Sequence, residues 1–158
     1  MKNAFLRQLK YIVPAAALII SPGVSLAGDV GGYKVTHGIG IYLGVVPTDL
    51  ITKHPREHAE RTMHEGVPTG KHHHHVMVAL FDDKTQDRIT DATVTAEVAE
   101  PGLAARSKAL EPMSIAGALT YGNYFEMRVG ALYRISVQVR RPGLAHAVKA
   151  EFEYRHHE

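Results

Sequence analysis

The sequence predicts an all-β protein, an antiparallel β-sandwich of six or seven short strands. Several segments alternate apolar and polar residues with a period of two, which is typical of half-buried strands. Clusters of glycine, proline and aspartate separate these segments at short intervals, as in antiparallel sandwiches. The chain shows neither an internal repeat nor the alternation of strands and helices that a parallel sheet needs.

The first 27 residues have the layout of a cleaved signal peptide. A basic start precedes the apolar run from Tyr11 to Ile20, and Ser25-Leu26-Ala27 provides the small residues of a cleavage site. A retained membrane anchor is the alternative, but the run has about half of the ~20 apolar residues that a bilayer requires. We therefore expect export to the periplasm, cleavage after Ala27, and one mature domain over residues 28–158 without a membrane span.

The composition of the mature chain limits its chemistry. Of 18 Lys and Arg, three lie in residues 1–27, whereas all 16 Asp and Glu lie beyond them, which leaves 15 basic against 16 acidic side chains. No basic surface for nucleic acid is therefore expected. All 11 histidines lie in the mature part, and cysteine is absent. Thiolate copper, zinc-finger and disulfide-exchange sites are thus excluded, and any metal must be held by His, Met, carboxylate or backbone groups.

The segment 28–70 is expected to combine an N-terminal arm with a short helix. Residues 28–38 are rich in glycine and predict an extended or loose arm, and residues 39–46 predict a first strand or a surface-hugging segment. Pro47-Thr48-Asp49 favours a turn or a helix start. A short polar helix is expected over residues 56–64, after which glycine and proline break the chain.

The main sandwich is expected over residues 71–158. A weaker strand at 106–115 contains Pro112, which favours an edge position because proline cannot donate to a ladder. Gly122-Asn123 is expected to form a bulge or bend within the strand that follows. The clearest alternation of apolar and polar residues gives the remaining strands, at 76–81, 92–98, 133–139 and 148–154.

Four consecutive histidines run directly into the strand 76–81. Successive strand side chains point to opposite faces, so His73, His75 and Met77 share one face. His72 and His74 share the other face with the apolar residues. Imidazole and thioether are ligands of borderline and soft metals, so we predict a metal site with copper as the first choice and zinc, nickel or iron as alternatives. A solvated basic patch is the other interpretation of these histidines.

Further candidate ligands lie on both sides of this strand. His58 and His64 belong to the expected short helix, which leads into the histidines through a short loop. A polar surface helix with incidental histidines is the alternative. Methionines usually fill gaps in a core, but thioether ligation would favour Cu(I). The predicted metal ligands are His73, His75, His64, Met77, His58, His72, His74 and Met113.

The order of motifs between residues 74 and 154 carries a family resemblance. The strand 76–81 is followed by the strand 91–96, Met113 lies in the middle, and Tyr121-Gly122-Asn123-Tyr124-Phe125 precedes the last two strands. In this order the chain resembles the small periplasmic domains of the FixH/YtkA-like class. The resemblance implies an immunoglobulin-like or cupredoxin-like sandwich, a role in metal handling and assembly of copper-containing membrane enzymes, and Met113 as a ligand.

Taken together, these patterns predict a periplasmic copper carrier or sequestering protein without enzymatic activity. Delivery to a membrane metal transporter or an oxidase-assembly partner would need accessible ligands, so we expect the His and Met ligands to be exposed. A shared metal would also allow a homodimer. Two alternatives stay open: an accessory module of a membrane complex with pH-sensitive histidines, and a mononuclear metalloenzyme with an open coordination position. Neither a HExxH motif, a nucleophile elbow nor a nucleotide-binding glycine pattern is present.

Overall fold

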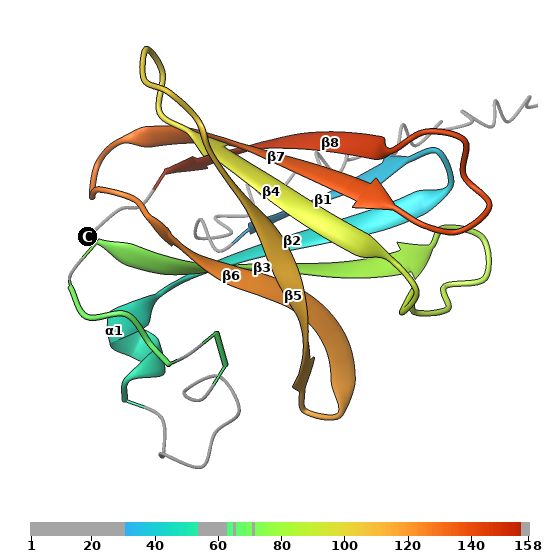
Figure 1. Ribbon diagram of the computed structural model, residues 1–158, viewed down its shortest axis with the longest axis horizontal. Coiled ribbons are helices and arrows are strands. Elements are labelled where there is room, and N and C mark those ends of the chain that lie inside the picture. Colours follow the sequence, from blue (N-terminus) through green and yellow to red (C-terminus); the bar gives the residue numbers. More distant parts are fainter. Residues whose placement is uncertain (1–30, 54–62, 65, 71, 156–158) are drawn as a thin grey trace, which may run out of the picture.

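A computed structural model describes residues 31–53, 63–64, 66–70 and 72–155. The described chain is almost entirely antiparallel β-structure, which confirms the all-β prediction (Figure 1). Its elements are β1 (Gly31–Thr36), β2 (Ile39–Pro47), α1 (Thr48–Ile51), β3 (His73–Asp82), β4 (Thr93–Ala99), β5 (Arg106–Ile115), β6 (Ala118–Glu126), β7 (Leu132–Arg140) and β8 (Val148–Arg155).

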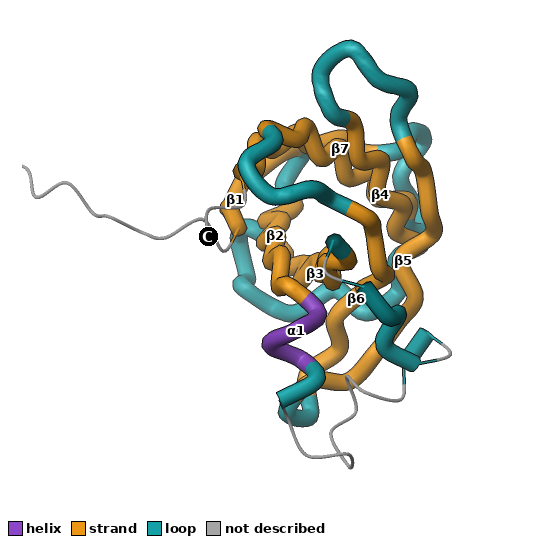
Figure 2. The backbone as a smooth tube through the Cα atoms, turned by 90° about the vertical axis from the view of Figure 1, so that its left-hand side faces the viewer, coloured by secondary structure: helices purple, strands orange, loops and turns teal. Residues whose placement is uncertain are grey.

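The strands follow the order β1-β2-β3-β6-β5-β4-β7-β8 and curl into two packed layers (Figures 1 and 2). Strand β5 passes from one layer to the other, because residues 106–110 pair with β4 and residues 111–115 pair with β6. Each half of β5 therefore has one hydrogen-bonded neighbour. This explains how Pro112 fits into the strand without removing a needed ladder bond.

The described residues form eight strands rather than the predicted six or seven. Part of the segment that we predicted to be an extended or loose arm, residues 28–38, forms β1 and pairs along its length with β2. His37 and Gly38 connect the two strands with φ values of 50° and 75°. Two consecutive positive φ values are typical of a tight hairpin turn. The glycine-rich composition that suggested an arm thus belongs partly to a hairpin.

The core lies between the two layers and is built from the inward-facing residues of each strand. Val76, Val78 and Leu80 of β3 are fully buried. Strand β8 shows the predicted alternation of buried and exposed positions, and β7 shows it except at Ser136, which is buried although it lies between two inward-facing residues. Strands β1 and β8 meet at the seam between the layers. A Cβ atom on Gly32 would lie 3.0 Å from the Phe152 ring, so glycine permits this close approach.

The described part of the segment between β2 and β3 carries one short helix. Helix α1 begins at Thr48, where we predicted a turn or a helix start. The helix expected at 56–64 falls largely outside the described residues, and His64 at its end has a φ of 52°, which is not helical. The expected signal peptide also lies outside them. No helix in the described part of the chain is long and apolar enough to cross a membrane.

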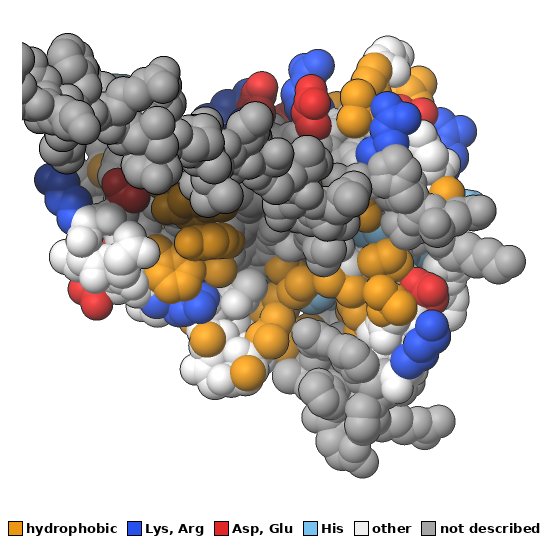
Figure 3. Space-filling view, turned by 180° about the vertical axis from the view of Figure 1, so that it is seen from behind, with side chains coloured by type: hydrophobic (Ala, Val, Ile, Leu, Met, Phe, Trp, Pro, Cys, Tyr) orange, Lys and Arg blue, Asp and Glu red, His pale blue; other side chains and the backbone are white. Residues whose placement is uncertain are grey.

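The outer face of β1, β2 and β3 divides into two regions. Toward the β1–β2 turn, Tyr33 stacks on Tyr42 with ring centroids 4.2 Å apart, and the Tyr42 ring meets the edge of Phe81 at 5.4 Å. In the view from behind, many of the described side chains at the surface are hydrophobic (Figure 3). The other end of β3 carries the histidines, so the aromatic row and the histidines occupy opposite ends of this strand.

Candidate metal centre

The histidines of β3 alternate between the two faces, as the strand geometry predicts. His74 points into the layer interface, where it is buried and its ring lies 6.1 Å from that of Tyr154. Its Nδ1 donates a hydrogen bond to the carbonyl oxygen of His72 at 3.3 Å, because a carbonyl can only accept. His75 points to the opposite face. The four histidines therefore do not form one ligand group.

His75 is completely buried although it faces away from the core, with 0% exposure. Its ring lies 4.7 Å from the ring of Tyr124 on β6. Burial, followed by the proximity of His64, lowers the pKa of His75 from 6.5 to about 4. His75 is therefore neutral at neutral pH, which is the form that binds a metal. Its buried Nδ1 has no hydrogen-bond partner among the described residues.

His64 covers His75 from the segment that connects α1 to β3. Its Nε2 lies 3.3 Å from Nε2 of His75, and its Nδ1 lies 2.8 Å from a carboxylate oxygen of Glu111 on β5. The His64 side chain is 5% exposed and meets the Tyr124 ring edge-on at 5.6 Å. A residue outside β3, eleven positions before His75 in the sequence, thus brings a second imidazole nitrogen to His75.

Met113 and Gly122 complete the arrangement from β5 and β6. Met113 is 5% exposed and does not belong to the hydrophobic cluster between the layers. A Cβ atom on Gly122 would lie 2.7 Å from Nε2 of His75 and 3.0 Å from Sδ of Met113. The glycine therefore marks a point that the nitrogen and the sulfur both approach. A side chain at this position would fill the space between these two donors.

These residues offer two imidazole nitrogens and one thioether sulfur at one place. Among the described residues no group of three or more His, Asp or Glu side chains is arranged to hold a metal ion. A site with three donors at this place would therefore include the sulfur of Met113. Mixed nitrogen and sulfur donors suit copper, and the thioether favours Cu(I). The approach of Nε2 of His75 and of the Met113 sulfur to Gly122 fits a metal-binding role.

The remaining predicted ligands lie elsewhere. His73 stands opposite Glu126 at the start of β3, and His72 is exposed just before it. Met77 lies opposite Gly122, but its terminal methyl approaches Gly44 on β2, at 3.5 Å from where a Cβ would be. His73 and His75, our first pair, lie two positions apart in β3, and as a ligand pair they stay a prediction. His58 falls outside the described residues, and His74 lies in the core as described above.

The sequence did not lead us to Glu111, Gly122 or Tyr124 as members of this site. Glu111 precedes Met113 by two positions, so the period of a strand could have placed both on one face. Gly122 was expected to mark a bulge, but it pairs in regular register with Met77 and with Glu111. Only the pairing of β6 with both β3 and β5 shows that this glycine lies beneath the donors.

Comparison with known proteins identifies the class of fold. No protein-family model matches the chain, and no curated protein matches its sequence. A copper-bound variant of FetP from uropathogenic Escherichia coli has a TM-score of 0.56 at 14% identity, covering 79% of this chain and 95% of FetP. FetP isolated after recombinant expression in the periplasm of E. coli gives 0.57 at 12% identity, over 80% and 94% of the two chains.

A DUF4426 family protein from Pseudomonas aeruginosa is similar to a comparable degree. Its TM-score is 0.58 at 14% identity, covering 82% of this chain and 98% of that protein. At such identities the likeness concerns the fold alone. The chain therefore has the fold of these small β domains, which confirms the fold that the resemblance to FixH/YtkA-like domains implied.

Proposed function

We propose that this protein binds copper in the periplasm through His64, His75 and Met113, and that it carries or sequesters the metal without catalysing a reaction. The observation that supports this most strongly is the close approach of Nε2 of His75 and Sδ of Met113 to the same glycine, Gly122. The fold likeness to a copper-bound FetP variant agrees with this choice of metal. The sulfur ligand makes Cu(I) the preferred oxidation state.

The burial of the donors determines how such a carrier would work. We expected exposed ligands, but the side chains of His64, His75 and Met113 are all at most 5% exposed. His64 belongs to a connecting segment and not to the sheet. Metal exchange with a membrane transporter or an oxidase-assembly partner would therefore begin with the release of His64, the one proposed ligand outside the strands.

The proposal is tested with two methionine variants of the purified protein. Loss of a residue that hydrogen-bonds to a metal ligand typically weakens metal binding by roughly 10–100-fold. Met113→Leu should weaken Cu(I) binding by more than this, because it removes a direct donor. Met127→Leu is the matched control, since Met127 is fully buried in the core between the layers. Exchanges of Met and Leu usually cost less than about 1.5 kcal/mol of stability, so both variants should fold.

The measurement is competition for Cu(I) with a chromophoric chelator under anaerobic conditions. Wild type and Met127→Leu should bind one equivalent with the same affinity, whereas Met113→Leu should release copper to the chelator. Equal affinities for all three proteins would place the metal elsewhere, and no stoichiometric binding by the wild type at low micromolar copper would refute the proposed function.

A further inference from the structure

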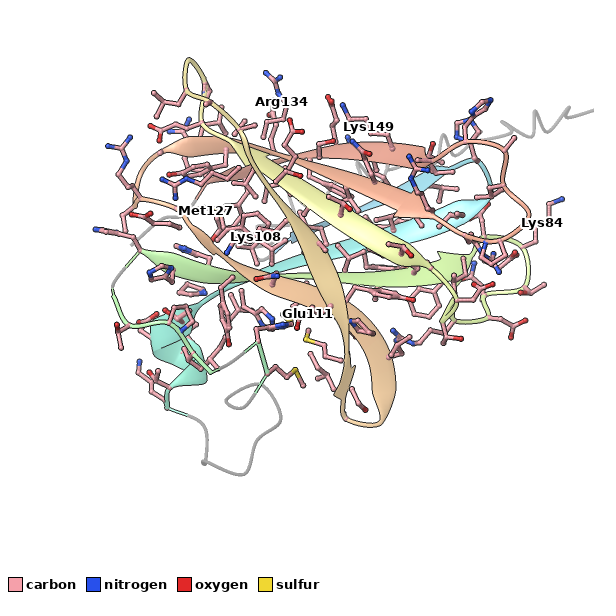
Figure 4. All side chains as sticks on the ribbon, in the orientation of Figure 1. Lys84, Lys108, Glu111, Met127, Arg134 and Lys149 are labelled. Carbon is pink, nitrogen blue, oxygen red and sulfur yellow. The ribbon has the colours of Figure 1, made fainter. Side chains whose placement is uncertain are left out.

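Glu111 contacts the proposed copper site without offering a donor to the metal position. It lies on β5 directly opposite Gly122 and two residues before Met113. Figure 4 labels Glu111 on the part of β5 that pairs with β6. One oxygen of its carboxylate lies 2.8 Å from Nδ1 of His64. The Glu111 side chain is 59% exposed, whereas that of His64 is 5% exposed. The contact thus connects the solvent-exposed rim to a buried imidazole.

This hydrogen bond decides which nitrogen of His64 carries the proton. An ionised carboxylate has no proton to give and can only accept a hydrogen bond. Nδ1 of His64 must therefore be the protonated nitrogen, and in a neutral imidazole Nε2 then holds the free lone pair. Nε2 is the atom that faces His75 at 3.3 Å. The contact with Glu111 consequently directs the metal-binding lone pair of His64 to the place where the other donors meet.

Two further features favour a positioning role over a contribution to stability. Ion pairs with a solvent-exposed partner contribute little to folding, and Glu111 is largely exposed. His64 also adopts a φ of 52°, in the left-handed region that non-glycine residues rarely occupy. The side chain of His64 contacts Glu111, His75 and Tyr124, and these contacts hold the residue in this unusual backbone conformation. Strained residues of this kind occur often at ligand-binding sites.

We infer that Glu111 is a positioning residue for copper: it keeps the proton of His64 on Nδ1 and aims Nε2 at the metal position. This inference rests on the proposed function of the same site. Carboxylates that accept a hydrogen bond from a metal-bound imidazole also make that imidazole a stronger ligand. The negative charge of Glu111 would partly balance the positive charge of Cu(I) in these buried surroundings.

The test compares Glu111→Ala and Glu111→Gln with wild type by two measurements. In the metal-free protein, nitrogen NMR of the His64 ring should show the proton on Nδ1 in wild type and a mixture of both tautomers in Glu111→Ala. In competition for Cu(I), Glu111→Ala should bind about 10–100-fold more weakly than wild type. Glu111→Gln should fall between them, because its amide oxygen still accepts from Nδ1 but carries no charge.

Glu126→Gln is the matched control. Glu126 is an exposed carboxylate on β6 that pairs with Arg106 at 2.8 Å and stands opposite His73. Its substitution should leave both the His64 tautomer and the Cu(I) affinity unchanged. If Glu126→Gln lowered the Cu(I) affinity as much as Glu111→Ala does, the effect would come from the loss of any nearby negative charge. That result would overturn the positioning role of Glu111.

The outcomes separate this inference from the proposed function. Suppose that wild type binds copper, that Met113→Leu binds it more weakly, and that Glu111→Ala binds it like wild type. The positioning role of Glu111 is then wrong, while the proposed copper site is retained. A proton on Nε2 of His64 in metal-free wild type would refute it as well. If wild type binds no copper, the proposed function fails and the role of Glu111 toward copper fails with it, even where the tautomer is as expected.

Discussion

Replacing Gly122 with alanine is expected to abolish copper binding although it removes no ligand. The new Cβ would lie 2.7 Å from Nε2 of His75, 2.8 Å from Cε of Met113 and 3.0 Å from its Sδ. These distances are shorter than van der Waals contact, so the methyl group would push both donors apart and occupy the space between them. We expect the Cu(I) affinity to fall by more than about 100-fold, which exceeds the usual effect of losing an outer ligand partner.

Gly44→Ala provides the control on the same face of the same layer. A Cβ on Gly44 would lie 3.5 Å from Cε of Met77, which is ordinary contact. This variant should keep the wild-type copper affinity, as measured by the same chelator competition. The melting temperature of metal-free Gly122→Ala should also be recorded, since added volume at a packed position typically costs about 1–3 kcal/mol. A folded Gly122→Ala protein that binds copper like wild type would refute the location of the site.

Lowering the pH from about 6.5 to about 4 is expected to destabilise the metal-free protein through His75. Burial lowers the pKa of His75 to about 4 in the folded protein, while the unfolded chain keeps the ordinary value of 6.5. As the pH falls through this interval, the unfolded state binds a proton that the folded state does not bind. Stability contributed by the neutral, buried ring is therefore complete above pH 6.5, and falls as the pH drops toward 4.

The expected loss is roughly 3 kcal/mol, because one pKa unit corresponds to about 1.4 kcal/mol. It is measured as the free energy of unfolding in urea between pH 4 and pH 7, in the presence of a chelator. His75→Gln should show a flatter profile, since the substituted side chain does not titrate. His146→Gln alters an exposed histidine and should keep the wild-type slope. Parallel profiles for wild type and His75→Gln would contradict the assignment of the pH dependence to His75.

The sequence alone determined the class of fold, because the alternation of apolar and polar residues is a local property of each strand. The strands β4, β7 and β8 lie close to the segments predicted at 92–98, 133–139 and 148–154. The division of the four histidines between two faces also followed from the period of a strand. Strand β1 was missed because glycine-rich composition suits both a loose arm and a hairpin, and only the pairing partner β2 decides between them.

The choice of ligands depended on the tertiary structure. His73 and His75 lie two positions apart in one strand, and it is His75 whose Nε2 lies 3.3 Å from His64 and whose ring lies 4.7 Å from Tyr124 on β6. Met77 and Met113 both belong to strands, and it is the sulfur of Met113 that approaches Gly122 together with Nε2 of His75. These contacts join residues from four separate parts of the chain. They come together because of the strand register and because β5 passes between the layers. Neither property can be recognised as a local pattern in a single sequence.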